Sequence, residues 1–126
     1  MKLKRKRMIK VKTKKLVNSF KYAIEGFKTS FKTERNMKIH VLAMVLVVLL
    51  GIYFKISMTE WCFIAVAIAM VIGSELFNTA IETIVDMVSP EKNPKAKLAK
   101  DISAAAVLAF AIGAAIVGAI IFIPKI

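Results

Sequence analysis

The chain has 126 residues, with 20 Lys and Arg against 8 Asp and Glu, and 58% of its residues are hydrophobic. A chain of this length forms one domain, and a soluble domain so small would leave too much of that apolar surface in water. The composition excludes a disordered tail, and the single cysteine, Cys62, excludes an internal disulfide scaffold. It favours a small integral membrane protein.

The positive charge is concentrated at the start of the chain. Residues 1–40 contain 14 of the 20 basic residues but only two acids, Glu25 and Glu34. Beyond them the basic and acidic residues balance, so the net charge of +12 belongs to the first third of the chain. An uncharged apolar run over 41–54 follows. We therefore interpret the basic segment as binding anionic lipid headgroups, and not nucleic acid, for which no recognition motif is present.

The predicted elements form one membrane domain over residues 1–126. A basic arm at 1–15 is followed by apolar residues at helical spacing, with lysines off the apolar stripe, which predicts an amphipathic surface helix over 16–37. Three apolar segments come next, each typical of a membrane-spanning helix. The three predicted spans are 39–59, 61–88 and 102–123, and a cytoplasmic loop over 89–101 joins the last two.

The distribution of lysine predicts the orientation in the cell membrane. The 89–101 loop has four lysines, whereas the turn between the first two spans has only Lys55 and the C-terminus only Lys125. The positive-inside rule therefore places the N-terminus and the 89–101 loop in the cytoplasm, and the C-terminus outside it. The third span is rich in Ala and Gly, which lets helices approach closely, so we expect a homo-oligomer.

An acidic face interrupts the second predicted span, in the stretch ELFNTAIETIVD at 75–86. At 100° per residue, Glu82 and Asp86 lie about 20° to either side of Glu75, and Asn78 lies about 60° away. Such groups either join helices through a polar network or mark a functional site, because a charge within the bilayer costs about 2.5 kcal/mol or more. Carboxylates beside a lysine-rich loop suit Mg²⁺ and phosphate chemistry, with a desolvated carboxylate removing a proton. The sequence has neither GxxxxGK[ST] nor GxGxxG.

ELFNTAIETIVD, followed by SPEKNPKAKLAKDISAAAV, resembles the signature of the prokaryotic diacylglycerol kinase/undecaprenol kinase family. FKYAIEGFK and ERNMKIH upstream also fit, and the resemblance covers 16–123. The ERN wording is closer to the Gram-positive branch, whose members act on undecaprenol. The resemblance implies an all-α homotrimer with sites between protomers that phosphorylates a lipid alcohol with ATP and Mg²⁺. The expected substrate is undecaprenol, with diacylglycerol as the alternative; a non-enzymatic membrane oligomer is the alternative from a different class.

The resemblance also implies roles for individual residues. Glu75 matches the catalytic base that takes the proton from the lipid hydroxyl, and Glu34 and Glu82 match the metal-binding carboxylates. The implied nucleotide-binding residues are Tyr22, Glu34, Glu82, Glu91, Lys92, Asn93, Lys100 and Asp101, with Asn78 and Asp86 as polar supports of the site. The EKNP stretch at 91–94 lacks the aromatic and imidazole side chains of some relatives. We interpret His40 as a structural residue at the entrance of a span.

Overall fold

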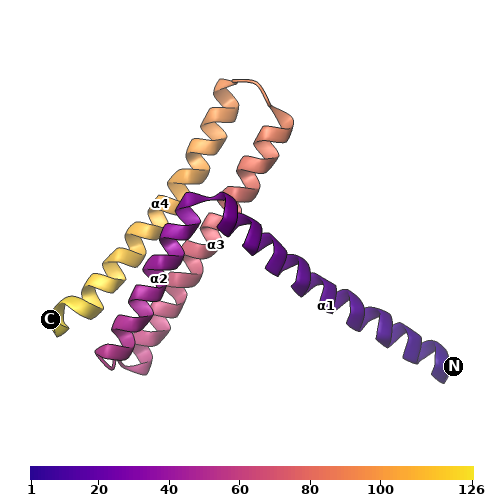
Figure 1. Cartoon of the computed structure of the whole chain (residues 1–126), viewed down its shortest axis with the longest axis horizontal. Coiled ribbons are helices and arrows are strands. Elements are labelled where there is room, and N and C mark those ends of the chain that lie inside the picture. The colour runs from indigo at the N-terminus through magenta and orange to yellow at the C-terminus, as the bar shows by residue number, and fades with distance from the viewer. The chain divides into compact units, whose positions relative to one another are not determined.

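The computed structural model describes residues 1–126 and is entirely helical (Figure 1). The chain divides into two compact units, Met1–Thr33 and Glu34–Ile126. The elements are α1 (Lys2–Thr33), α2 (Arg35–Tyr53), α3 (Met58–Val88), α4 (Pro94–Phe122) and a short 3₁₀ helix η1 (Ile123–Lys125). The predicted all-α fold is confirmed.

The first unit is the single helix α1, where we expected a basic arm followed by a helix over 16–37. Its 32 residues are continuous from Lys2 to Thr33. The helix stops because Glu34 adopts an extended backbone, with φ −105° and ψ 116°, and a new helix begins at Arg35. The binding of this unit to a membrane surface stays a prediction.

Helices α2, α3 and α4 are each long and apolar enough to cross a membrane. They contain 19, 31 and 29 residues, against the roughly 20 residues needed to cross the hydrocarbon layer. The prediction of three such helices is confirmed, although their bounds differ. The second begins at Met58, before the predicted 61, because Ser57 and Glu60 form a capping box: the Ser57 side chain accepts from the Glu60 N–H, and the Glu60 side chain accepts from the Ser57 N–H.

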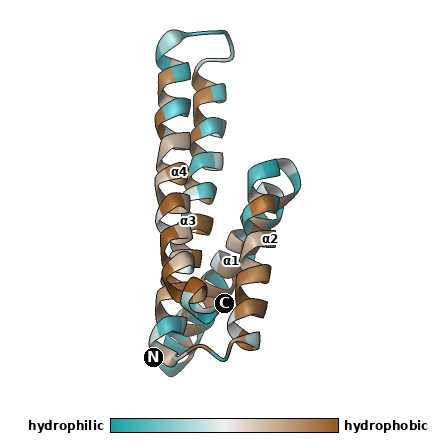
Figure 2. Cartoon of the chain, turned by 90° about the vertical axis from the view of Figure 1, so that its left-hand side faces the viewer, coloured by the Kyte–Doolittle hydropathy of each residue, from teal (hydrophilic) through white to brown (hydrophobic).

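Helices α3 and α4 form an antiparallel hairpin and lie side by side along their length (Figures 1 and 2). Asn93 caps α4 by accepting from the N–H of Lys95, and Pro94 takes a first-turn position that needs no N–H donor. The loop predicted over 89–101 is therefore shorter, and Lys100 and Asp101 lie within α4. We call this end of the hairpin the loop end and the 54–57 end the turn end. Hydrophilic residues gather toward the loop end (Figure 2).

An apolar core lies at the turn end of the second unit. Its buried members come from the turn, α3 and the end of α4: Ile56, Ile64, Ile121 and Phe122. Lys125 Nζ lies 2.8 Å from Glu60 Oε2 and ties the C-terminal segment to the start of α3. Away from this end α2 leans away from the α3–α4 hairpin (Figure 2). The core therefore holds α2 against the other helices at the turn end. The predicted acidic residues lie farther along the helices, toward the loop end.

Candidate active site

The centre of the candidate site is Glu75 on α3. The residue is completely buried, at 0% exposure, and neither carboxylate oxygen has a hydrogen-bond partner. Burying a carboxylate without partners costs free energy. A fold that retains such a group is less stable than one without it, and a functional role explains why the group is retained. The structure thus places the residue predicted as the base in a water-poor environment with both oxygens free to accept.

Other titratable groups approach Glu75 from α2 and from α3 itself. His40 Nε2 on α2 lies 3.7 Å from Glu75 Oε2, too far for a hydrogen bond. Glu34, at the start of α2, and Glu82, two turns along α3, are close enough to interact electrostatically with Glu75. The two predicted metal-binding carboxylates therefore lie in the neighbourhood of the predicted base, and His40 lies there with them.

The amide of Asn78 joins the acidic face to α4. Ser103 Oγ on α4 donates a 2.7 Å hydrogen bond to Asn78 Oδ1, and both residues are buried. The Asn78 amide nitrogen is then directed to Glu82 Oε1 at 3.4 Å. Sequence reasoning identified Asn78 but missed Ser103. A signal was present, because Ser103 is the only hydroxyl-bearing residue in the predicted span 102–123.

Basic and acidic side chains pair at the loop end. Lys100 Nζ on α4 donates to Asp86 Oδ1 on α3 and so closes the hairpin. Lys97 Nζ lies 2.6 Å from Asp101 Oδ2, one turn along the same helix. Lys100, predicted to contact nucleotide phosphates, and Asp86, predicted as a support, are thus partners of each other, whereas Asp101 has its partner within α4.

A hollow of about 760 Å³, which we call the loop-end hollow, opens beside this ion pair. Its lining residues are Asp86, Ser89, Pro90, Glu91, Lys92, Asn93, Pro94, Ala96, Lys97 and Lys100. Four residues predicted to bind nucleotide therefore line one hollow: Glu91, Lys92, Asn93 and Lys100. Tyr22, also predicted to bind nucleotide, lies on α1 in the other unit with an exposed side chain.

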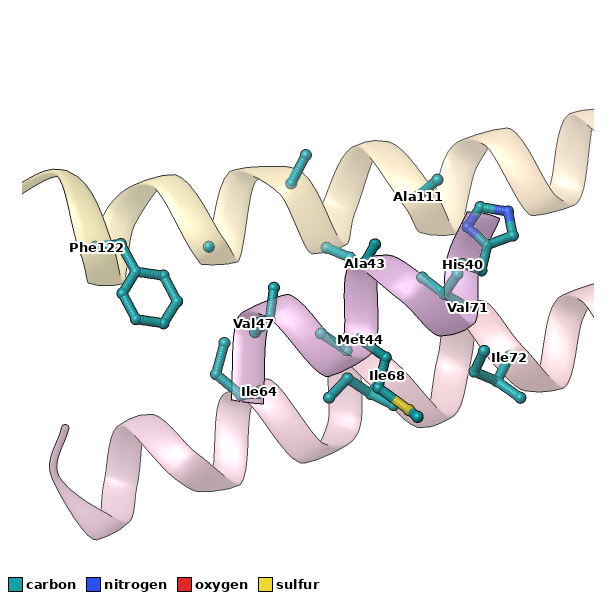
Figure 3. A pocket seen from close by; sticks show the side chains of 14 residues that line it. His40, Ala43, Met44, Val47, Ile64, Ile68, Val71, Ile72, Ala111 and Phe122 are labelled. Atoms are coloured by element: carbon teal, nitrogen blue, oxygen red, sulfur yellow. The ribbon is translucent and has the colours of Figure 1, made fainter. Parts of the chain in front are cut away.

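A second cavity, of about 470 Å³, lies among α2, α3 and α4 (Figure 3). We call it the apolar cavity, because His40 is the only polar residue among the fourteen that line it. His40 lies toward one end of the row of lining residues and Phe122 toward the other (Figure 3). The apolar cavity can take a hydrocarbon chain, and its polar end is the residue beside Glu75.

The donor set near Glu75 fits Mg²⁺ held in part by a substrate. No group of three or more His, Cys, Asp or Glu is close enough to hold a metal ion by itself. Mg²⁺ in phosphoryl-transfer sites is usually held by one or two carboxylates together with phosphate oxygens and water. Glu34 and Glu82, both partly exposed, supply two such carboxylates.

Comparison with known proteins agrees with these features. The family model for prokaryotic diacylglycerol kinase matches residues 21–122. The chain is 40% identical over 108 residues to undecaprenol kinase of Bacillus subtilis, covering 86% of this chain and 88% of the relative. It is 37% identical over 112 residues to diacylglycerol kinase of Synechocystis sp., covering 88% of this chain and 64% of the relative. It is 30% identical over 108 residues to diacylglycerol kinase of Haemophilus influenzae, covering 85% of this chain and 92% of the relative.

The family resemblance read from the ExxNTAIExxxD pattern is thereby confirmed, and the non-enzymatic alternative is set aside. With three helices able to cross a membrane, the chain is a membrane protein, a lipid kinase that belongs to the prokaryotic diacylglycerol kinase family.

Proposed function

We propose that the chain transfers the γ-phosphoryl group of ATP to the hydroxyl of undecaprenol, with diacylglycerol as the alternative lipid alcohol. The observation that carries the proposal is the complete burial of Glu75 with both carboxylate oxygens unpartnered. The 40% identity to a protein named undecaprenol kinase supports that substrate, and the 37% identity to a diacylglycerol kinase supports the alternative.

In the proposed reaction Glu75 accepts the proton of the lipid hydroxyl. The hydroxyl oxygen then bonds to the γ-phosphorus while the bond from that phosphorus to the bridging oxygen breaks, and ADP leaves with the electron pair. Positioning and charge stabilisation account for most of the catalysis in such transfers. A buried carboxylate suits the proton transfer, because no water competes for its oxygens.

The nucleotide is proposed to bind in the loop-end hollow, with its phosphates toward the acidic face. Lys100 and Lys92 line this hollow and would offset phosphate charge. Glu34 and Glu82 would hold Mg²⁺, which when bound neutralises charge on the phosphate oxygens. Lys100 would then exchange its present partner, Asp86, for a phosphate.

The proposed orientation puts the loop end and the N-terminus in the cytoplasm, where ATP is found, and the C-terminus on the other side. The lysines of the loop end contrast with the single Lys125 beyond the last span. The twelve basic residues of α1 would bind anionic headgroups on the same side. The lipid alcohol would reach Glu75 laterally, with hydrocarbon available to the apolar cavity.

We further propose a homotrimer with sites shared between protomers. The apolar faces of α2 to α4 remain largely exposed in one chain, and α2 leans away from the hairpin. The small residues of α4 permit close packing between helices. Mixing the Glu75→Gln and Lys100→Ala variants before reconstitution tests this assembly. Shared sites would restore part of the activity, whereas sites contained within one chain would leave the mixture inactive.

The decisive experiment measures transfer from γ-labelled ATP in mixed micelles, with undecaprenol and diacylglycerol offered separately and together. We expect faster labelling of undecaprenol. Preference for diacylglycerol would correct the substrate and leave the residue roles in place. Labelling of neither lipid by the folded protein with Mg²⁺ present would contradict the proposed reaction.

The role of Glu75 has its own test in the same assay. Glu75→Gln keeps the size of the side chain but removes the proton acceptor, so turnover should be lost while Mg·ATP binding persists. The matched control is Glu60→Gln, which changes an acid at the turn end of the same helix and should leave turnover unchanged. A Glu75→Gln variant that keeps more than a few per cent of the rate would contradict the assignment of the base.

A further inference from the structure

His40 is a polar neighbour of the predicted base that the sequence pattern does not indicate. It lies on α2, outside the ELFNTAIETIVD segment, and its sequence position suggested a structural residue at a span entrance. In the structure its Nε2 is 3.7 Å from Glu75 Oε2. Its side chain is 19% exposed, against 1% for Glu75, so His40 is the more accessible member of the pair.

The surroundings of the two side chains leave each with few polar neighbours. Both oxygens of Glu75 lack hydrogen-bond partners. Of the other groups that interact with Glu75, Glu34 and Glu82 are carboxylates and donate nothing, and the amide of Asn78, on the same helix as Glu75, is directed to Glu82. His40 is also the only polar member of the apolar cavity wall. His40 is thus the N–H donor that approaches Glu75 from another helix.

We propose that His40 is a positioning residue for Glu75, an inference that rests on the proposed function. A short movement of α2 toward α3 would turn the 3.7 Å approach into a hydrogen bond from Nε2–H to Oε2. Hydrogen bonds of this kind are often long in a site without substrate and shorten in the complex. With Oε2 held, the carboxylate can no longer rotate freely, and Oε1 remains to accept the proton of the lipid hydroxyl.

Because His40 lies on α2, its contact with Glu75 depends on the position of that helix, which also lines the apolar cavity where lipid is proposed to bind. Ala43, Met44 and Val47 follow His40 on the same helix and line the apolar cavity (Figure 3). Helix α2 is fixed at the turn end and leans away from the hairpin elsewhere (Figure 2). Apolar material that fills the cavity would draw α2 toward α3, and His40 would move with it. The hydrogen bond would therefore form when lipid is present.

The test compares three full-length variants in the micelle assay, with kcat and the KM for each substrate measured separately. Gln places an amide N–H near the position of Nε2, Asn places it about one bond short, and Leu has none. We expect His40→Gln to keep kcat within about threefold of wild type, and both His40→Asn and His40→Leu to lower it by about tenfold or more. The KM for ATP should stay unchanged in all three.

The control is Leu42→Met, which changes an exposed apolar side chain of α2 that does not line the cavity, and it should leave kcat and both KM values unchanged. Titration with Mg·ATP shows which variants are folded. If His40→Leu does not fold, the comparison of His40→Gln with His40→Asn still tests the proposal. Equal rates for Gln and Asn, whether high or low, would overturn the proposal. Loss of turnover in Glu75→Gln together with wild-type rates in the His40 variants would overturn it while leaving the proposed function intact.

Discussion

The hydroxyl of Ser103 on α4 donates its hydrogen bond to the side-chain oxygen of Asn78 on α3, across 2.7 Å of buried interface. That bond fixes which way the Asn78 amide faces, because the oxygen is committed to α4 and the nitrogen is left toward Glu82. The helix that carries the acidic face is therefore locked to α4 at the level of the candidate site. Packing of the hairpin and orientation of a proposed metal ligand depend on the same hydroxyl.

Removing this hydroxyl should cost both stability and metal affinity. Ser103→Ala leaves Asn78 Oδ1 buried without a donor, and we expect the free energy of unfolding to fall by about 0.5–2 kcal/mol. The Mg²⁺ concentration for half-maximal rate should rise. The control is Ser74→Ala, because Ser74 is equally buried but donates only to the carbonyl of Val71 in its own helix. Unfolding by detergent titration in micelles measures the first effect, and equal losses for the two variants would contradict it.

Lys100 should matter for nucleotide binding, and Lys97 should not. Lys100→Gln removes a cation that lines the loop-end hollow, so the KM for ATP should rise by about tenfold or more. Lys97 is 78% exposed and paired with Asp101 in the same helix, and Lys97→Gln should change the KM little. Asp86→Asn frees Lys100 from its partner, and the KM should fall by about two- to fivefold. A rise with Asp86→Asn would mean that Asp86 holds Lys100 in its working position.

Much of the fold and of the acidic face was predictable from local pattern. Uncharged runs of about 20 residues define spanning helices, and helical periodicity puts Glu75, Asn78 and Glu82 on one face without knowledge of any partner. The start of α4 was also predictable, because Asn93 and Pro94 form an ordinary helix-start signal. The loop predicted over 89–101 is too long because that prediction does not use this signal.

His40 and Ser103 could not be assigned from periodicity. Each follows the charged start of its helix and comes directly before an apolar run, and its role depends on a partner on another helix. The proposed role of His40 depends on Glu75, 35 residues away in sequence, and the role of Ser103 depends on Asn78, 25 residues away. Such pairings are set by how helices pack, which hydrophobic pattern constrains only loosely.

The approach of α2 to α3 should be sensitive to a single methyl group at Gly51. A Cβ at this position would lie 2.6 Å from Trp61 Cη2 and 2.9 Å from Trp61 Cζ2, closer than atoms can pack. Gly51→Ala therefore has to displace the indole ring, and we expect a loss of about 1–3 kcal/mol in unfolding free energy. Gly26→Ala, on α1 with nothing within 4 Å of the new Cβ, is the control and should be neutral or stabilising. If both variants lose a similar amount of stability, the loss comes from the helix backbone and not from displacement of Trp61.

The ion pair between Glu60 and Lys125 should be separable from the cap that Glu60 also provides. Glu60 Oε1 accepts from the Ser57 N–H at 3.0 Å, whereas Oε2 pairs with Lys125 at 2.8 Å. Glu60→Gln keeps an oxygen for the cap and loses the ion pair. Lys125→Met loses the ion pair and the 3.2 Å hydrogen bond from Lys125 Nζ to the carbonyl of Ile121. Glu60→Ala loses the ion pair and the cap. Glu60→Gln should therefore lower the unfolding midpoint by a small amount, and Lys125→Met and Glu60→Ala should each lower it by more.

The double variant decides whether the ion pair exists in the membrane-embedded protein. If Glu60 and Lys125 interact, Glu60→Gln should have little further effect in a Lys125→Met background, because the pair is already broken. Added salt should lower the wild-type midpoint toward that of either single variant, since the pair lies at the turn end, where solvent screens it. Fully additive losses, with no response to salt, would show that the two side chains act independently, and that the C-terminal segment is held by the packing of Ile121 and Phe122 and not by this ion pair.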